Sequence, residues 1–229
     1  MKIDRILHPA RFLSRPNRFG AWVEVEGRTE YVHLPDPGRL RELLVPGAPV
    51  WLAPGVGAAR KTRYDLVLVR QNGHLVSVDT GLPTRTVREA LRGGAIPEFR
   101  GYQAVRPEVR FGGSRLDFLL SGDSGACLVE VKSVTLVQDG RGLFPDAVTK
   151  RGTRHLQELL RAVQEGYRAC VFFVVQREDA NSCAPNEGTD PGFTKALRLA
   201  VASGVEALAY TCQVSLHEIS LLRRVPVVI

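Results

Sequence analysis

RLDFLL at residues 115–120 and LVEVKS at residues 128–133 are the two stretches that decide how the second half of this sequence folds. Both are short runs of large apolar and β-branched residues, which is typical of strands. A glycine-bounded segment lies between them, and such a segment is typical of a hairpin turn. The pattern predicts a β-hairpin with one carboxylate on each arm, Asp117 and Glu130. Lys132 follows two residues after the second carboxylate, so it shares the face of Glu130.

The turn predicts the register of this hairpin. If the two residues between Gly122 and Gly125 form its centre, counting back along both arms places Asp117 directly opposite Glu130. Two facing carboxylates repel each other, so we expect a positive charge between them. A divalent cation held by oxygen atoms would supply it, and so would the Lys132 ammonium alone.

The composition is that of an ordinary folded protein. The 229 residues are 44% hydrophobic and 24% charged, enough for one large or two small domains. The longest clearly apolar run, residues 169–175, is too short to cross a bilayer, and the first residues have no apolar signal-peptide core. We therefore expect a cytoplasmic protein without a membrane partner. The four cysteines are scattered without the paired spacing of a zinc site.

The net charge of +7 favours a polyanionic partner such as nucleic acid.

The first 80 residues contain short alternating runs separated by tight turns, which predicts a small β-barrel. Its predicted strands cover residues 19–26, 29–33, 50–53, 64–69 and 75–78. The remainder alternates helix and strand, which predicts a mixed sheet flanked by helices. Its predicted helices cover residues 84–92, 145–164 and 193–203, and further strands cover residues 168–175 and 206–212.

Two carboxylates and a lysine on neighbouring strands are the arrangement that metal-dependent phosphodiesterases use. The carboxylates hold Mg²⁺, which lowers the pKa of a bound water, and the lysine orients that water or stabilises charge on the phosphate. The alternative from the pattern alone is an exposed ion pair on a sheet face.

Other residues are candidates for the same chemistry. Glu89, on the helix before the hairpin, is either an additional metal ligand or a solvated helix glutamate. Arg151 and His155 are four residues apart on one helix and share a face, so they either contact a phosphate or lie on the surface. Lys150 lies at the same helix end and is a further candidate for nucleic-acid contact.

The barrel carries candidates for nucleic-acid binding as well. The turn HLPDPGR at residues 33–39 offers backbone donors and Arg39, although plain turn chemistry explains it equally well. Trp22 would stack on a base if it lines the barrel face, and would otherwise belong to the core. A basic cluster lies between the predicted strands at residues 50–53 and 64–69, and it comprises Arg60, Lys61 and Arg63.

Five segments in order resemble the sugar fermentation stimulation protein A family. They are HLPDPG at 33–38, RLDF at 115–118, VEVKSVT at 129–135, FPDAVTKRG at 144–152 followed by HL at 155–156, and GVE at 204–206. The resemblance covers essentially the whole chain. The family usually has His-Cys-Pro-Asn-Thr-Gly at the first segment, and this chain departs from it at Leu34, Asp36 and Pro37.

The resemblance implies an α/β protein with two domains. Residues 1–80 would form an OB-fold domain that binds nucleic acid, and residues 81–229 a mixed-sheet PD-(D/E)XK nuclease-like domain. The family is associated with DNA binding and with regulation of sugar utilisation.

The motif of the nuclease superfamily implies site residues. Asp117, Glu130 and Lys132 correspond to its metal-binding and catalytic positions, and Glu89 to the acidic residue that some members carry on the first helix. The expectation is a DNA-binding protein with a Mg²⁺- or Mn²⁺-dependent nuclease site that acts on single- or double-stranded DNA, with RNA as a further candidate partner. The alternative is a non-cleaving DNA-binding regulator of sugar-utilisation genes. The oligomeric state is not predicted.

Overall fold

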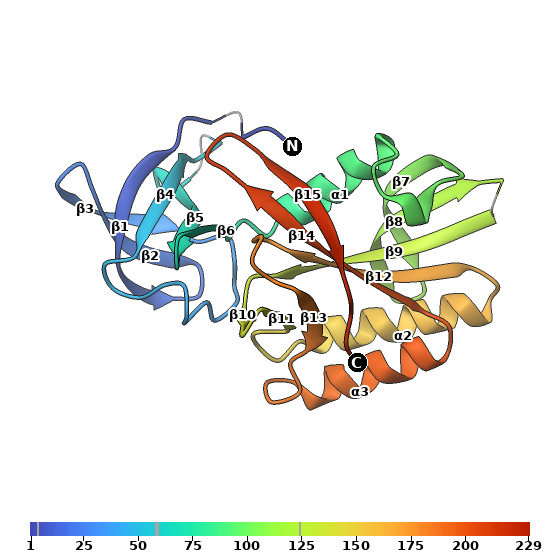
Figure 1. Ribbon diagram of the computed structural model, residues 1–229. Coiled ribbons are helices and arrows are strands. Elements are labelled where there is room, and N and C mark those ends of the chain that lie inside the picture. Colours follow the sequence, from blue (N-terminus) through green and yellow to red (C-terminus); the bar gives the residue numbers. More distant parts are fainter. Residues whose placement is uncertain (4, 58–59, 124) are drawn as a thin grey trace.

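A barrel comes first in the chain and a mixed sheet with helices on both faces follows, as Figure 1 shows. The computed structural model describes residues 1–3, 5–57, 60–123 and 125–229. The order of elements confirms the predicted arrangement of a small barrel followed by a mixed α/β domain. In the described part of the chain, no helix is both long and apolar enough to cross a bilayer.

Six strands form the barrel sheet: β1 (His8–Asn17), β2 (Gly20–Val25), β3 (Arg28–His33), β4 (Pro49–Pro54), β5 (Tyr64–Gln71) and β6 (His74–Ser77). Their order is β3-β2-β1-β4-β5-β6, and a parallel bridge from β3 to β5 closes the sheet. Ala21, Val23 and Val25 of β2 point inward, as the alternation predicts. Strand β1 was not predicted, because Phe12 is its only buried residue and its sequence lacks an apolar period.

The second domain contains three helices and nine strands among the described residues. They are α1 (Leu82–Arg92), β7 (Tyr102–Phe111), β8 (Ser114–Gly122), β9 (Gly125–Val134), β10 (Val137–Gln138), β11 (Arg141–Phe144), α2 (Lys150–Gln164), β12 (Arg168–Val175), β13 (Ser182–Pro185), α3 (Pro191–Ala202), β14 (Glu206–Val214) and β15 (Ile219–Val225), with a short 3₁₀ turn at Pro97–Phe99. The main sheet has the order β15-β14-β12-β9-β8-β7, and β10, β11 and β13 form a small second sheet. Strands β9, β12 and β14 are parallel, as their helical crossovers predict.

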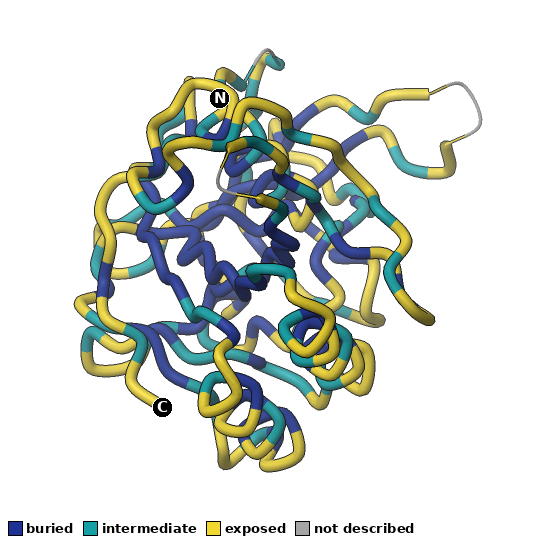
Figure 2. Tube along the Cα trace, turned by 90° about the vertical axis from the view of Figure 1, so that its right-hand side faces the viewer, coloured by how far each residue is buried: buried dark blue, intermediate teal, exposed yellow. Residues whose placement is uncertain are grey.

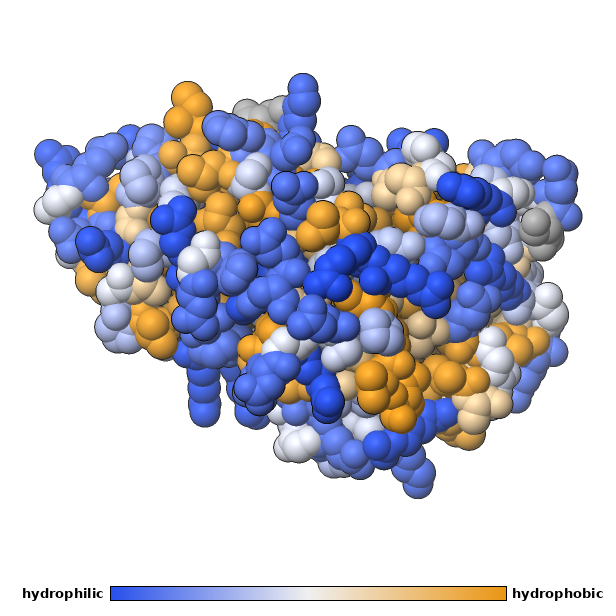
Figure 3. All heavy atoms as spheres, in the orientation of Figure 1, coloured by the Kyte–Doolittle hydropathy of each residue, from blue (hydrophilic) through white to orange (hydrophobic). Residues whose placement is uncertain are grey.

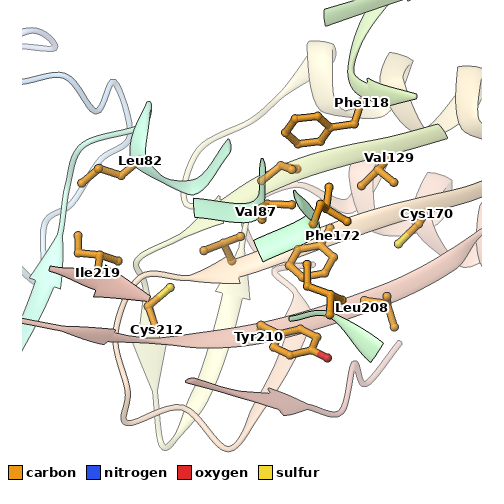
Figure 4. Packing of buried hydrophobic residues seen from close by; sticks show 14 of the residues in the cluster. Leu82, Val87, Phe118, Val129, Cys170, Phe172, Leu208, Tyr210, Cys212 and Ile219 are labelled. Carbon is orange, nitrogen blue, oxygen red and sulfur yellow. The ribbon is translucent and has the colours of Figure 1, made fainter. Parts of the chain in front are cut away.

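Helices cover both faces of the main sheet. Strand β12 is buried on both sides: Phe172 packs toward α1, and Phe173 packs toward α2 and α3. Figure 4 shows the α1 side, where Val87 lies near Phe172. Figure 1 shows α2 and α3 together on the other side, and Figure 2 shows the buried residues gathered in the interior. All four cysteines are buried and free.

The β8–β9 hairpin has the predicted register. Gly122 pairs with Gly125, and the ladder continues to Phe118 opposite Val129. The next step of this register sets Asp117 across from Glu130, just where the two strands stop pairing. Ser124, in the centre of the turn, lies outside the described residues. Although Leu116 and Phe118 are two residues apart on β8, Phe118 packs in the α1 core and Leu116 packs in the α2 core.

Helix α2 begins five residues later than the sequence predicts. Thr149 is its N-cap, and the Thr149 hydroxyl accepts a hydrogen bond from the Gly152 N–H at 3.0 Å. Pro145 and Asp146 favour a helix start at this position in the sequence, but the Asp146 side chain contacts the barrel instead. Its carboxylate accepts a hydrogen bond from the Leu40 N–H at 3.3 Å. The side chain that was expected at the helix end therefore joins the two domains.

The domains contact each other through apolar and polar groups. Trp51, Val67 and Leu68 of the barrel belong to the α1 core. The buried Arg177 donates to Gln71 Oε1 of the barrel at 2.7 Å. The start of the chain also reaches the second domain, because Lys2 forms an antiparallel bridge with Glu218 beside β15.

Candidate active site

Three elements bring the predicted site residues together. Asp117 lies near the middle of β8, Glu130 and Lys132 lie on β9, and His155 lies on α2, which crosses the same face of the sheet. The strand period places Glu130 and Lys132 on one face, and the packing of α2 places His155 over that face.

Glu130, Lys132 and His155 form a buried cluster. Lys132 Nζ lies 2.5 Å from Glu130 Oε1, and His155 Nδ1 bonds the same oxygen. Lys132 Nζ and His155 Nδ1 are 3.5 Å apart. The exposed fractions are 4% for Glu130, 8% for Lys132 and 2% for His155. The exposed ion pair that was the alternative reading is therefore replaced by an ion pair inside the protein.

Arg151 fixes the protonation of His155. Arg151 Nε–H donates to His155 Nε2 at 3.3 Å, so Nε2 acts as the acceptor. Nδ1 is then the nitrogen that donates a hydrogen bond to Glu130. Arg151 and His155 share a face as predicted, but His155 is buried and both of its ring nitrogens are engaged. In this arrangement His155 positions Glu130 and does not reach a phosphate.

The Asp117 carboxylate lies at the end of the β8–β9 ladder, just beyond the last paired residues Phe118 and Val129. Its Oδ2 accepts a hydrogen bond from the Val131 N–H at 2.8 Å. Burial and the neighbouring Glu130 carboxylate raise the pKa of Asp117 to about 6, against the hydrogen bond and the charge of Lys132. Asp117 therefore takes up a proton more readily than an ordinary aspartate, and a positive charge beside it would favour its ionised form.

Glu130 remains ionised. Burial disfavours its charge, but the hydrogen bond from His155 and the charge of Lys132 outweigh burial and lower the pKa of Glu130. Its second oxygen, Oε2, is buried and has no hydrogen-bond partner among the described residues. Such an atom is costly to bury alone and is a free ligand for a cation.

A cleft of about 220 Å³ lies between the domains, beside the site. The barrel turn at residues 36–38 and the loop at residues 143–149 line it, and so does Ser133, the neighbour of Lys132. Asp36 in this cleft is buried, and its Oδ1 accepts from the Gly38 N–H at 2.7 Å. Burial, reinforced by the charge of Asp146, raises the pKa of Asp36 to about 6. The proximity of Asp36 and Asp146 could not be predicted from the sequence, because 110 residues separate them along the chain.

The structure does not bring Glu89 into the site. Helix α1 covers the face of the sheet opposite to α2, so Glu89 is on the far side from Glu130. Its carboxylate is 63% exposed and pairs with the Met1 amino group at 2.9 Å. The helix was predicted, but the face of the sheet on which it would pack could not be read from its sequence. Among the described residues, no group of three or more His, Cys, Asp or Glu side chains is arranged to hold a metal.

The predicted nucleic-acid contacts are dispersed. Lys150 and Arg151 are exposed at the start of α2, and Arg39 is exposed next to the interdomain cleft. Trp22 is 40% exposed on the barrel and stacks obliquely on Tyr31, with ring centres 5.0 Å apart.

The basic cluster of the barrel divides into two groups. Lys61 and Arg63 are exposed, whereas Arg60 forms an ion pair with the buried Asp65. His33 Nδ1 also bonds Asp65, at 2.8 Å. These contacts of Asp65 were not predicted, although a lone aspartate within an apolar strand indicates a buried charge that needs partners.

Family models match nearly the whole chain. "SfsA N-terminal OB domain" matches residues 13–78, and "Sugar fermentation stimulation protein RE domain" matches residues 81–218. The chain belongs to the sugar fermentation stimulation protein family. The resemblance drawn from its motifs is thereby confirmed, and so is the fold class at the level of an OB-fold barrel followed by a mixed-sheet α/β domain.

Relatives in this family are similar over their full length. A sugar fermentation stimulation protein homolog from Moorella thermoacetica is 54% identical over 220 residues, which cover 95% of each chain. One from Geobacter metallireducens is 45% identical over 100% of both chains. The structure of Pyrococcus furiosus SfsA in complex with Ca²⁺ superposes with a TM-score of 0.90 at 31% identity and covers 100% of both chains.

Proposed function

We propose that this protein binds DNA and cleaves its phosphodiester bonds at Asp117, Glu130 and Lys132 with Mg²⁺ or Mn²⁺. The observation that carries the proposal is the unpartnered, buried Oε2 of Glu130 across the hairpin from Asp117. A family relative solved with Ca²⁺ supports a divalent ion. The proposed location is the cytoplasm, where the nucleic acid of the cell is accessible.

The residues fit such an ion. Mg²⁺ is usually held by one or two carboxylates together with water and phosphate oxygens, so Asp117 and Glu130 are sufficient protein ligands. A bound ion would supply a water of lowered pKa and a positive charge beside the phosphate. It would also relieve the repulsion between Glu130 and the Asp117 carboxylate, whose pKa is raised.

The protein groups have separate roles in the proposal. Lys132 holds its ammonium at the edge of the site, where it stabilises negative charge that develops on the phosphate. His155 acts through Glu130, because its Nδ1–H fixes the orientation of that carboxylate. Arg151 keeps the proton of His155 on this nitrogen and offers its remaining guanidinium donors to the solvent side.

The second candidate function is a DNA-binding regulator that does not cut. It is favoured by one observation: Lys132 and His155 already satisfy Glu130 Oε1, so the cluster is stable as a purely internal ion pair. The same fold would then bind nucleic acid through its barrel, and the cluster of Glu130, Lys132 and His155 would stabilise the fold without taking part in catalysis.

The two candidates are separated by incubating the protein with labelled single-stranded DNA, duplex DNA and RNA in Mg²⁺, Mn²⁺ or EDTA. The proposal expects metal-dependent cleavage that is lost in Asp117→Asn and in Glu130→Gln, while binding is retained. Asp123→Asn is the matched control, because it removes an exposed carboxylate from the same hairpin. Mn²⁺ binding followed by electron paramagnetic resonance gives a second readout, and both site variants should weaken it. Intact substrate in every metal, with binding preserved, would support the regulator.

A further inference from the structure

Helix α1 carries a row of arginines on its exposed side. Arg85, Arg88 and Arg92 lie three and four residues apart, so they share one helix face. Together with Met1, Lys2 and Glu89 they line a groove of about 500 Å³. A second groove of about 210 Å³ continues from it toward the barrel and shares Met1, Lys2 and Arg85. We call Lys2, Arg5, Arg85, Arg88 and Arg92 the α1 basic strip.

The strip keeps an excess of positive charge. Two described carboxylates line the grooves, Asp79 and Glu89, and both are already paired. Asp79 lies 3.3 Å from Arg85, and Glu89 lies 2.9 Å from the Met1 amino group. Among the described residues, neither Arg88 nor Arg92 has an acidic partner. As far as the described residues go, the guanidinium groups of Arg88 and Arg92 therefore have donors that can bind an anion.

The strip extends from one domain to the other. Arg5 bonds Asp65 of the barrel at 3.4 Å, and Arg60 of the basic cluster pairs with the same aspartate. The positive surface thus runs from α1 of the nuclease-like domain to the turn between β4 and β5. An elongated ligand that carries many negative charges matches this shape better than a single small anion does.

The arginine spacing suits a phosphate backbone. Arg85, Arg88 and Arg92 are separated by roughly 4.5 and 6 Å along the helix axis. A DNA strand presents one phosphate for about every 3.4 Å of its axis, so the row spans roughly three phosphates. An anionic membrane would additionally need a continuous apolar face. In Figure 3 the hydrophobic side chains on the visible face form separate groups.

The strip lies away from the candidate active site. Helix α1 and α2 cover opposite faces of the main sheet, and Glu130 contacts His155 of α2. Two packed layers, at about 10 Å each, separate the strip from that contact. A nucleic acid that occupies both must pass around the edge of the protein, so a short oligonucleotide in the site cannot reach the strip.

We infer that the α1 basic strip is a second nucleic-acid-binding surface, which holds the sugar–phosphate backbone of a long substrate outside the active site. The inference rests on the proposed DNA binding but not on cleavage. It predicts that affinity depends on the strip for long nucleic acids and does not depend on it for short ones.

The test uses the full-length protein in EDTA, with fluorescence anisotropy of a labelled 30-base-pair duplex and of a 6-nucleotide strand. Arg88→Glu combined with Arg92→Glu should weaken duplex binding at least tenfold at 50 mM salt. The slope of log K against log salt should become shallower by about 1.8, that is 0.9 for each lost phosphate contact. Binding of the 6-nucleotide strand should be unchanged.

Lys195→Glu combined with Arg198→Glu makes the same charge change on the exposed face of α3 and is the matched control. Arg88→Gln with Arg92→Gln, checked by thermal melting, shows whether lost binding reflects lost folding. Duplex affinity equal to wild type, or an equal loss in the α3 control, would overturn the inference while leaving the proposed nuclease intact. Loss of binding to anionic vesicles, with the duplex unaffected, would overturn it in favour of a membrane. Absent cleavage with the strip effect present would overturn only the nuclease.

Discussion

Replacing Asp36 by asparagine should stabilise this protein at neutral pH. Asp36 is 7% exposed and faces the carboxylate of Asp146 across the interdomain cleft. Asparagine keeps the oxygen that accepts the Gly38 N–H and removes the charge. Its amide would also offer a donor to the Asp146 carboxylate. Asparagine is, moreover, the usual residue of the family motif at this position.

The magnitude follows from the pKa of Asp36. Burial raises it from 3.8 to about 6, so the folded protein holds this proton more tightly than the unfolded chain does. Stability contributed by the group is therefore present below pH 4 and is lost as the pH rises toward 6. At about 1.36 kcal/mol per pKa unit, the loss at pH 7 approaches roughly 3 kcal/mol. We expect Asp36→Asn to recover about 1–3 kcal/mol at pH 7 and less than about 1 kcal/mol at pH 4.

Urea unfolding followed by tryptophan fluorescence at pH 4, 5, 6 and 7 measures this difference. The slope of free energy against urea should be the same for both proteins. Asp123→Asn, at an exposed turn, should show no comparable gain. Asp117 has a raised pKa as well, so the stability of the Asp36→Asn variant should still change with pH. A gain of equal size at pH 4 and pH 7, or a loss at pH 7, would refute the electrostatic reasoning.

Three other substitutions test neighbouring features. His155→Ala removes a buried ring and the donor to Glu130, and we expect a loss of about 2–4 kcal/mol in unfolding free energy, measured by urea titration. Gly38→Ala places a methyl group 2.8 Å from the Asp36 carboxylate oxygen Oδ1 and should lower the free energy of unfolding by about 1–3 kcal/mol. Gly188→Ala is the control, because its methyl group would have its nearest neighbour at 4.0 Å, and its effect in the same titration should be near zero. Trp22→Ala should weaken binding of a single-stranded oligonucleotide by about 1–3 kcal/mol in an anisotropy titration. The melting temperature should be nearly unchanged, since the Trp22 ring is 40% exposed. Unchanged affinity would show that Trp22 is not part of the interface.

The hairpin register could be predicted from the sequence, because the glycine-bounded turn and the two-residue period of strands leave few alternatives. The parallel pair β12 and β14 could be predicted for a similar reason, since one helical crossover separates their apolar runs. Strands β7 and β15 were missed, because both are edge strands with few buried residues and their sequences show weak apolar patterning.

The sequence predicts only those neighbours in the candidate site that lie on directly paired strands. Asp117, Glu130 and Lys132 lie on paired strands, so sequence counting brings them together. The bond from His155 to Glu130 depends on how α2 packs over β9, and the separation of Glu89 depends on which face α1 covers. Such choices between faces are made by tertiary packing, and one helix sequence does not encode them alone.

The bridge between Lys2 and Glu218 has a consequence for the order in which the molecule is completed. The Met1 amino group donates to the carbonyl of Ile219, 218 residues later, so this tether is a contact of very long sequence separation. During synthesis the barrel leaves the ribosome long before its leading segment has a partner, and that segment docks only when the final β-hairpin emerges. Completion of the carboxyl-terminal edge and fastening of the amino-terminal segment are therefore one late event, which limited proteolysis of stalled nascent chains would reveal as a single step in protection.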